Sequence, residues 1–493
     1  MWNSTWQIIS AVLYTMNLGL AVYAATTMIL RKQDPVKTIS WLVVLILLPY
    51  IGVIFYFFFG QNYRKKKMYS RKGIADYRLR KELSASQAQL FRRDPSLLGS
   101  ELLPYKKIIY QNLRNSYTVV EHNSNIEFFF TGRTALDAMY KAIEGAKKHI
   151  HLQSYIFEDD ITGKRFRELL IKKAKEGLEV RIMYDGVGSI ALNKEFITPM
   201  KEVGIETLNF SPVRFLLPTS LLNYRNHRKI LVIDGKAGFL GGVNIADRYY
   251  YGSEAGDWHD THIKIVGESV FALQASFLLD RYFVLNRKIK KWKKYYPTLE
   301  LLNNGKHNEN TRVFSQTITS GPDSDWSNIM QCYFSTITSA TKHIYIVTPY
   351  FTPNETILNA IKIAALGDIE VRLMLPENSD TKIVHWSTMS YVTELLEAGV
   401  KVYLFNEGFN HSKVISIDGN ISIVGSANMD IRSFEHNFEI MSIIYSKECA
   451  QIIEKQFIKD CSGCKQINAL KWSKRKRSQK IKESFARLWS PLL

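Results

Sequence analysis

Cysteine is scarce in this chain, with four residues among 493: Cys332, Cys449, Cys461 and Cys464. Their irregular spacing excludes the disulfide framework of a small secreted domain. Cys461 and Cys464 have the spacing of a metal-binding pair, but no second pair completes a tetrahedral site. Two reduced thiols are therefore the favoured interpretation, and a structural metal is the alternative.

Acidic residues are also in deficit, because 46 Asp and Glu stand against 65 Lys and Arg and leave a net charge of +19. This balance suits a polyanionic partner, either nucleic acid or the anionic face of a bilayer. The length of 493 residues and the hydrophobic content of 46% are sufficient for several cores. We therefore expect more than one domain.

The N-terminus lacks the basic n-region and the small-residue cleavage site of a secretory signal peptide. Residues 6–30 and 38–60 are nearly free of charge, and each reaches the roughly 20 apolar residues that a membrane span needs. A short link over residues 31–37 joins them. The pattern predicts a transmembrane hairpin, with a tolerable kink at Pro49 in the second span.

The orientation of the hairpin follows from the Lys and Arg residues that flank it. The link holds three of them, and residues 64–72 after the second span hold six. The heavier side should be cytoplasmic, which places the rest of the chain on the cytoplasmic face of the cell membrane, although the three positives of the link oppose this. The basic run would then contact anionic headgroups or serve only as a stop-transfer signal.

The remainder of the chain contains one unit twice. The segment that starts at His149 matches the segment that starts at His343, 194 residues later, whereas the later match of His227 with His411 spans 184. The first copy should therefore carry an extra loop of about ten residues, within residues 211–225. A repeat of this length indicates two similar domains.

Each copy alternates helical patterns with short β-rich apolar runs. This alternation predicts an α/β sandwich with a largely parallel, buried sheet in each half. The expected helices cover residues 134–148, 163–176, 328–341 and 354–365. The expected domains are a transmembrane hairpin (1–62), a basic connector (63–118), a first repeat (119–285), a basic linker (286–312), a second repeat (313–465) and a basic amphipathic tail (466–493).

The most specific feature is a stretch that occurs at residues 226–235 and again at residues 410–419. Each copy places a His, then a Lys two positions on, then an apolar run and Asp-Gly. Residues two apart in an extended strand face the same way. The imidazole and the cation of each copy therefore share a face: His227 with Lys229, and His411 with Lys413. Two such pairs can close around one phosphate.

A phosphodiester is anionic, so its attack requires nearby positive charge and a proton for the departing alkoxide. A neutral histidine can serve as a covalent nucleophile and a charged one as a general acid. His227 and His411 could divide those roles across one phosphorus. Two lysines and two downstream amides would hold the non-bridging oxygens of the phosphate: Lys229, Lys413, Asn244 and Asn428.

Carboxylates further along each copy would support the histidines. A carboxylate that binds the far ring nitrogen of each His would fix its tautomer, and Asp260 and Glu439 are the candidates. Asp234 and Asp418 are either catalytic or bind only nearby backbone. Ser426 follows a glycine where the first copy has Gly-Gly, so its hydroxyl has no counterpart.

The scheme requires no metal and no other cofactor. His259 and His262 flank a candidate carboxylate and could be taken for a metal cluster, but the second copy has no counterpart of them.

These residues resemble the phospholipase D superfamily, whose members carry two His-x-Lys-x-x-x-x-Asp motifs with downstream Gly-Gly or Gly-Ser and Asn. The resemblance covers roughly residues 120–460. The apolar segment around Pro49-Tyr-Ile-Gly and the C-terminal residues 484–493 are similar to those of bacterial cardiolipin synthases. The resemblance therefore extends over nearly the whole chain.

The resemblance implies that two phosphatidylglycerols become cardiolipin and glycerol through a phosphatidyl-histidine intermediate. His227 would attack the first lipid while His411 protonates the departing glycerol, and His411 would then act as base toward the second lipid. The N-terminal copy more often supplies the nucleophile in the superfamily, which favours His227. Phosphatidylglycerol and anionic membrane lipids are the expected partners, and nucleic acid is not.

Two other functions are compatible with the same motifs. With water as acceptor, the chain would be a phospholipase D-type hydrolase of lipid or nucleic acid, although a nuclease has no evident need of membrane spans. A non-catalytic membrane adaptor should have lost a motif residue, and both sets are intact. The tail over residues 471–493 combines basic residues with an apolar helical stripe, which predicts contact with the bilayer surface, or core packing as the alternative.

Overall fold

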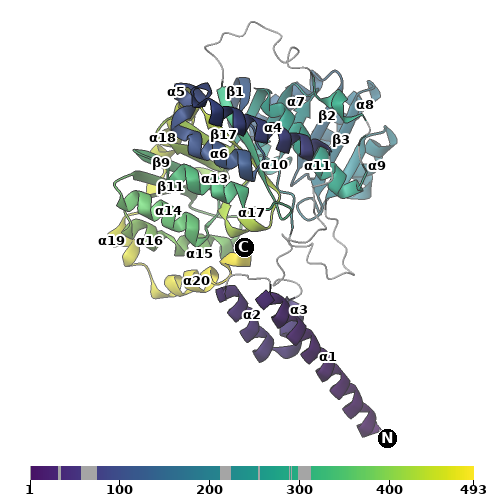
Figure 1. The fold of residues 1–493 in the computed structure, drawn as a ribbon, viewed down its shortest axis with the longest axis vertical. Helices are drawn as coiled ribbons and strands as arrows, with labels where there is room; N and C mark the ends of the chain where they lie inside the picture. Colours follow the sequence, from purple (N-terminus) through teal and green to yellow (C-terminus); the bar gives the residue numbers. More distant parts are fainter. Residues whose placement is uncertain are drawn as a thin grey trace. The chain divides into compact units, whose positions relative to one another are not determined.

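The computed structural model describes residues 2–30, 35–56, 75–210, 224–253, 256–287, 289, 291–297 and 313–492 (Figure 1). It contains two compact units. Unit 1 comprises residues 1–66 and 213–224, and unit 2 comprises residues 67–212 and 225–493. The extra loop expected within residues 211–225 falls almost entirely outside the described residues.

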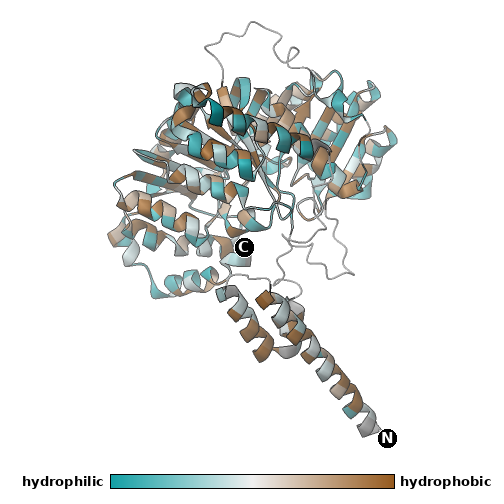
Figure 2. Cartoon of the chain, in the orientation of Figure 1, coloured by the Kyte–Doolittle hydropathy of each residue, from teal (hydrophilic) through white to brown (hydrophobic). Residues whose placement is uncertain are grey.

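Unit 1 begins with α1 (Trp2–Leu30), which carries no charged side chain (Figure 2). Residues 5–30 of this helix are long and apolar enough to cross a membrane. Trp6, Val12 and Tyr23 are each more than half exposed within the chain, as expected for side chains that face lipid. Near the C-terminal end of α1, Ala24 and Met28 are buried against the two helices that follow.

The second apolar segment forms two short helices, α2 (Pro35–Leu47) and α3 (Pro49–Phe55). α3 folds back along α2 (Figure 1): a Cβ atom built on Gly52 would lie 2.6 Å from the carbonyl oxygen of Val44. The rings of Trp41 and Tyr56 are 5.8 Å apart. Proline disfavours helical geometry in the residue before it and has no N–H for the helix, which explains the break at Leu48.

This pair of helices replaces the single second span predicted over residues 38–60. The 13 residues of α2 extend about 20 Å, whereas the hydrocarbon core of a bilayer is about 30 Å thick. Over the described residues 35–56, the segment therefore folds back on itself instead of forming one long helix. Residues 57–60 lie outside the described part of the chain.

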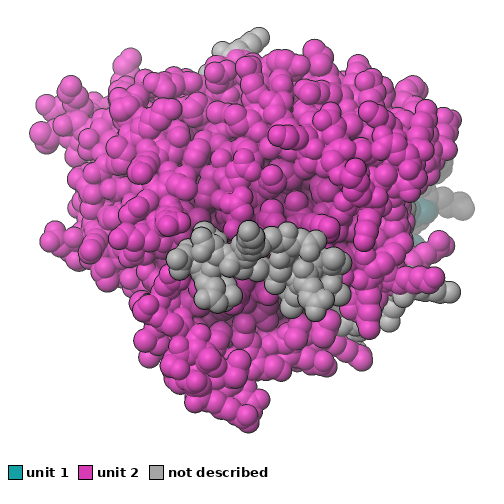
Figure 3. All heavy atoms as spheres, turned by 90° about the horizontal axis from the view of Figure 1, so that it is seen from above, with its two compact units in different colours: residues 1–66, 213–224 teal, residues 67–212, 225–493 magenta. Residues whose placement is uncertain are grey.

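One sheet of 16 strands runs through unit 2, which Figure 3 draws in magenta. Its first half follows the order β1 (Glu121–Thr131), β7 (Asp257–Gly267), β6 (Ala237–Gly241), β5 (Ile230–Ile233), β2 (His149–Ser154), β3 (Glu179–Asp185) and β4 (Glu206–Phe210). Its second half repeats this order as β8 (Val313–Ser320), β17 (Glu439–Tyr445), β15 (Ile421–Gly425), β14 (Val414–Ile417), β9 (His343–Val347), β11 (Glu370–Pro376) and β12 (Lys401–Phe405), with β18 (Lys465–Gln466) at the edge.

The two halves are related by a pseudo-twofold axis at the centre of the sheet, where β1 and β8 pair antiparallel. Two repeats are thus confirmed, but the expectation of a largely parallel sheet is wrong. Parallel pairing joins β2 to β3 and β3 to β4, and likewise β9 to β11 and β11 to β12. The strands between them and the centre are antiparallel, because tight turns such as the one at Asp234 connect β5 to β6.

Helices cover both faces of the sheet (Figure 1). One face carries α11 (Ser269–Leu285) and α18 (Lys447–Gly463), whose apolar side chains form a core shared by both repeats. The other face carries a separate core in each repeat. The four expected helices are confirmed there as α7 (Gly132–Glu144), α8 (Ile161–Lys175), α13 (Asn328–Ile337) and α14 (Glu355–Leu366). The remaining helices of the repeats are α9 (Lys194–Glu202), α10 (Asp247–Tyr251), α15 (Lys382–Ser390), α16 (Val392–Glu397) and α17 (Ile431–Glu435).

The described part of the basic connector belongs to the core of the second repeat. It forms α4 (Ala75–Arg93), α5 (Gly99–Leu102) and α6 (Lys106–Asn115). Phe91 and Ile109 pack in one cluster with Ile318 of β8.

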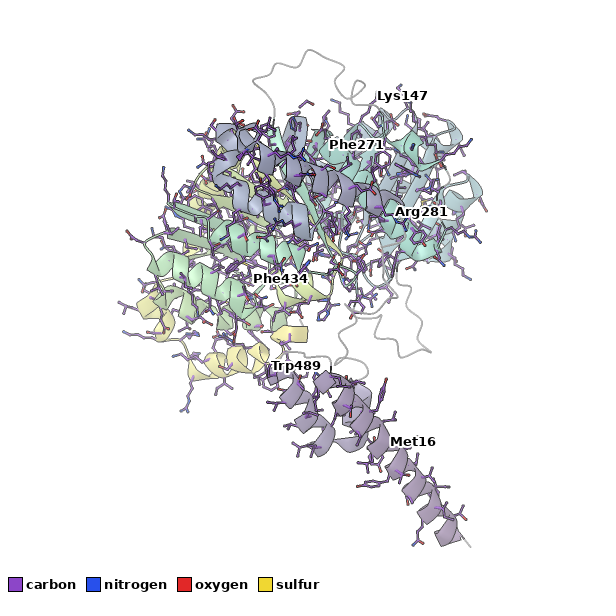
Figure 4. The ribbon with its side chains drawn as sticks, in the orientation of Figure 1. Met16, Lys147, Phe271, Arg281, Phe434 and Trp489 are labelled. Atoms are coloured by element: carbon purple, nitrogen blue, oxygen red, sulfur yellow. The ribbon has the colours of Figure 1, made fainter. Side chains whose placement is uncertain are left out.

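The C-terminal tail forms α19 (Ala469–Ser473) and α20 (Arg477–Arg487). One side of α20 packs inward, with Ala486 almost fully buried. The opposite side is apolar and exposed, at Ile481 (61%), Phe485 (60%) and Leu488 (76%). Trp489, labelled in Figure 4, continues this stripe and is 45% exposed. Core packing is thus confirmed for one face of the helix, and contact of the other face with the bilayer surface stays a prediction.

Candidate active site

The two motif histidines lie in extended segments that lead into β5 and β14, at the junction of the repeats. Each segment is held by the opposite repeat: the backbone N–H of His227 donates to the carbonyl oxygen of Phe438 at 3.0 Å, and that of His411 donates to His259 at 2.7 Å. The short strand β13 (Gly408–Asn410), directly before His411, pairs in parallel with β7 of the first repeat. The fold therefore brings together two segments that are 184 residues apart.

A cavity of about 540 Å³ lies at this junction, and both histidines line it. Its other lining residues come from both repeats: Tyr155, Ile156, Arg225, Asn244, Arg248, Tyr249, Trp258, Tyr350, Thr352, Asp380, Thr381, Val384, Asn428, Asp430, Arg432 and Asn437.

Each histidine binds a carboxylate from the other repeat. Nδ1 of His227 lies 2.9 Å from Oε1 of Glu439, and Nδ1 of His411 lies 2.8 Å from Oδ2 of Asp260. Because a carboxylate accepts, Nδ1 of His227 carries the proton of the neutral ring and its Nε2 keeps the lone pair, whereas Nδ1 of His411 also lies 2.9 Å from Nζ of Lys413. The two supporting carboxylates expected from the sequence thus take these positions, with the pairing exchanged between repeats.

Burial keeps both imidazoles neutral. It lowers the pKa of His227 to about 4, against the attraction of Glu439. Burial and the charge of Lys413 hold the pKa of His411 well below its ordinary value. A neutral ring with a free Nε2 is the form that can attack phosphorus.

The two supporting carboxylates have unequal surroundings. Burial acts to raise the pKa of Glu439, but His227, Lys229 and a hydrogen bond from Ser426 outweigh it and hold that pKa below its usual value. At the matching place in the first repeat, a Cβ on Gly242 would lie 2.1 Å from Oδ1 of Asp260, so no side chain fits there. Asp260 lacks that support, and burial raises its pKa to about 7.

The two lysines lie behind the histidines and are not among the residues that line the cavity. Nζ of Lys229 donates to the carbonyl oxygen of His227 at 2.7 Å, and that of Lys413 donates to the carbonyl oxygen of His411. Burial lowers the pKa of Lys229 to about 7 and that of Lys413 to about 8. Their charge is therefore sensitive to an anion that enters the cavity.

The two asparagines line the cavity, as expected. Asn244 accepts the N–H of Ile156 at 3.1 Å and donates to the hydroxyl of Tyr249 at 2.7 Å. Oδ1 of Asn428 is buried and accepts no hydrogen bond from the described residues. Ser426 does not line the cavity, and its contact with Glu439 makes it a residue that positions His227 from behind.

Asp234 and Asp418 are not among the residues that line the cavity, and their contacts favour the backbone-binding alternative. Both have positive φ angles, 55° and 56°, in the turns that end β5 and β14. The carboxylate of Asp234 accepts the backbone N–H groups of residues 147, 148 and 149 at 2.7–2.9 Å. That of Asp418 accepts those of residues 341, 342 and 343 at the same distances. Each Asp therefore fixes the start of the neighbouring strand, β2 or β9.

Several cavity residues were not expected from the sequence. The ring of Tyr155 lies 4.8 Å from that of His227, and the hydroxyl of Tyr249 lies 3.4 Å from Nδ1 of His411. Arg248 and Arg432 are separated by 184 residues, the same interval as the histidines. Extension of the repeat comparison beyond the motif would have identified these two arginines.

Within the described part of the chain, no group of three or more His, Cys, Asp or Glu residues is arranged to hold a metal ion. His259 contributes its backbone carbonyl to the site, as described above, and His262 is fully buried beneath it.

Comparisons with known proteins agree with this geometry. Residues 139–258 and 333–461 match the family model described as cardiolipin synthase, PLD-like domain, and residues 19–61 match the phospholipase D-nuclease N-terminal model. A cardiolipin synthase of Alkalihalophilus pseudofirmus is 38% identical over 485 residues, which cover 98% of this chain and 93% of the relative. This chain belongs to the cardiolipin synthase family.

Another member of the cardiolipin synthase family, from Halalkalibacterium halodurans, is 39% identical over 477 residues, which cover 96% of this chain and 92% of the relative. Among solved structures, the phosphatidylserine synthase of Haemophilus influenzae has the same fold, with a TM-score of 0.60 at 16% identity. That match covers 79% of this chain and 100% of the synthase. The resemblance to the phospholipase D superfamily is confirmed.

Proposed function

We propose that this chain is a cardiolipin synthase, which transfers the phosphatidyl group of one phosphatidylglycerol to a second and releases glycerol. The observation that carries the proposal is the pair of buried His–carboxylate contacts on one cavity, at 2.9 Å for His227 and 2.8 Å for His411. Two poised imidazoles on one phosphorus supply a nucleophile and a proton donor without any further group.

In the first step, Nε2 of His227 attacks phosphorus. A P–N bond forms while the P–O bond to the terminal glycerol breaks, and His411 gives a proton to the departing oxygen. The anionic lipid favours the protonated form of His411, and the carboxylate of Asp260 at Nδ1 stabilises and orients that imidazolium. Glu439, kept ionised, orients His227 as nucleophile.

In the second step, a hydroxyl of another phosphatidylglycerol takes the place of glycerol. It gives its proton to His411 and attacks phosphorus, and the P–N bond to His227 breaks. Cardiolipin leaves and both rings return to their starting state. The cations of Lys229 and Lys413 stabilise the negative charge that develops on the phosphate. That negative charge in turn raises their pKa values from about 7 and about 8.

We propose that unit 1 anchors the enzyme in the membrane by one crossing. α1 spans the bilayer, and α2 and α3 enter from the cytoplasmic face and return to it. The turn between them is apolar and exposed, with Ile46 at 76% and Leu47 at 71%, which suits the bilayer interior. The basic residues of the link and those after residue 60 then share the cytoplasmic side, which removes the conflict between them.

This topology places the N-terminus outside the cell, whereas two full spans would place it inside. A Ser4→Cys variant should react with a membrane-impermeant thiol reagent in intact cells, and a Lys32→Cys variant should react only after lysis. If Ser4→Cys is protected until lysis, the single crossing is wrong.

The catalytic repeats would meet the lipid surface through α20. Its exposed stripe of Ile481, Phe485 and Leu488 is flanked by basic residues, an arrangement that suits the interface of an anionic bilayer. This contact would bring the cavity to its substrate.

The deciding experiment is to incubate the purified full chain with phosphatidylglycerol in detergent micelles and to separate the lipid products. Cardiolipin with equimolar glycerol is the expected product. Phosphatidic acid alone would show that water is the acceptor and that the chain is a hydrolase. His227→Ala and His411→Ala should each abolish turnover, and substantial activity in either variant would contradict the two-histidine scheme.

A further inference from the structure

The two ends of the cavity differ in charge, although the repeats that build them are equivalent. At the His227 end, Arg225 and Arg432 line the cavity near Tyr155, whose ring packs against His227, and Arg225 lies 3.8 Å from the carboxylate of Asp185. At the His411 end, the ring of Tyr350 lies 6.2 Å from the imidazole, and its hydroxyl donates to Oδ2 of Asp380 at 2.7 Å.

The difference in charge follows from residues that differ at equivalent positions of the two repeats. Tyr350 corresponds to Ile156 in the first repeat, so the phenol at the His227 end, Tyr155, comes from a different repeat position. Arg248, the equivalent of Arg432, forms an ion pair with Glu158 at 2.8 Å. The position of Glu158 is Thr352 in the second repeat, and among the described residues no carboxylate pairs with Arg432.

A phosphatidylglycerol headgroup also has one charged end and one neutral end, like the two ends of the cavity. Its phosphate is anionic and requires cations, whereas its terminal glycerol is neutral and carries two adjacent hydroxyls that require acceptors. An ionised carboxylate offers about four acceptor positions. In Asp380, Tyr350 occupies one and the hydroxyl of Ser379, at 3.2 Å, occupies another, so capacity remains for a diol.

We propose that Tyr350 and Asp380 form the subsite for the terminal glycerol of phosphatidylglycerol, which rests on the proposed function. The two hydroxyls of the glycerol donate to the free positions of the Asp380 carboxylate and to the phenolic oxygen of Tyr350. The headgroup then points toward His411, which is the residue that must protonate it.

The test compares two acceptor alcohols, only one of which carries the adjacent hydroxyls that the subsite would bind. The full chain in phosphatidylglycerol micelles is given labelled glycerol, which exchanges into the lipid, or ethanol, which yields phosphatidylethanol. Both reactions use the same phosphatidyl-histidine intermediate, but ethanol has no second hydroxyl. The ratio of the two rates therefore isolates recognition of the diol.

Asp380→Asn should lower the glycerol-to-ethanol ratio about tenfold, as expected for loss of a hydrogen bond to a charged group. Transfer to ethanol should fall less than transfer to glycerol, because ethanol lacks the second hydroxyl that Asp380 would bind. Tyr350→Phe, which keeps the ring, should lower the ratio in the same direction. The matched control is Asp368→Asn, because Asp368 lies on the surface outside the cavity in a left-handed turn (φ 66°) that Asn adopts readily.

An unchanged ratio in both variants overturns the subsite, as does an equal fall of both reactions, which would mean a general loss of the active site. Faster transfer to ethanolamine than to glycerol in the parent chain would also overturn the subsite, because it would then bind a cation in preference to a diol. If the parent chain exchanges glycerol but makes no cardiolipin, the proposed function fails while the ratio still tests the subsite.

Discussion

Ser426 offers the sharpest test of how the site is organised, because it acts on His227 only through Glu439. Its hydroxyl donates to Oε2 of Glu439, whose other oxygen binds Nδ1 of His227 at 2.9 Å. Ser426→Ala removes this donor without touching the cavity. A hydrogen bond to a charged group contributes about 1.5–3 kcal/mol, so kcat should fall roughly 10- to 100-fold if the contact is fully used in the transition state.

The same substitution should move the pH profile. The hydrogen bond from Ser426 lowers the pKa of Glu439, so its loss raises that pKa. Glu439 then becomes protonated at a higher pH, and the acidic limb of kcat should shift upward. KM for phosphatidylglycerol should change little, because Ser426 does not line the cavity.

The assay is cardiolipin formation in mixed micelles from pH 5 to pH 9, with kcat and KM measured separately. Ser422→Ala is the matched control: Ser422 lies in β15, which ends directly before Ser426, is 1% exposed, and its hydroxyl has no partner among the described residues. A double variant with Glu439→Gln should be no slower than Glu439→Gln alone. A kcat equal to that of the control, or a loss confined to KM, would refute the reasoning.

Three further predictions follow from residues outside this contact. kcat/KM, which reports the free enzyme, should decline as the pH rises through about 7 and about 8, because Lys229 and then Lys413 lose the charge that attracts the phosphate; a kcat/KM profile flat to pH 9 would contradict this. Asp234→Asn should lower the free energy of unfolding by about 1–3 kcal/mol in urea titrations, because the carboxylate binds backbone N–H groups at the start of β2. The kcat of the folded enzyme should stay within about twofold, and a selective loss of kcat would indicate a catalytic role. The double substitution Phe485→Ser and Leu488→Ser should lower the fraction of a unit 2 fragment that sediments with anionic vesicles. The control Ile363→Ser, at a similarly exposed position on α14, should leave that fraction unchanged. Equal binding by all variants would show that α20 does not contact the lipid.

Much of the site could be predicted from the sequence because the repeat marks it twice. The histidines, lysines and asparagines occur at one interval, and the helices of both copies have clear patterns. The exchange of carboxylates could not be predicted, since it depends on a three-residue strand, Gly408–Asn410, that has no periodicity of its own. Asp380 lies in a loop without a repeated pattern. The fold-back at Leu48 was missed because lipid tolerates a proline kink and the apolar run continues past it.

The exchange of carboxylates makes the catalytic unit equivalent to a dimer whose subunits are tied into one chain. In a symmetric dimer, every substitution would appear at both ends of the cavity. Here the two halves can diverge independently. Glu439 has a supporting serine while Asp260 has a glycine, and the position of Tyr350 in the second repeat is Ile156 in the first. Covalent linkage also keeps the halves at a high effective concentration at any enzyme dilution. Fusion of the repeats is thus what allows two equivalent histidines to specialise.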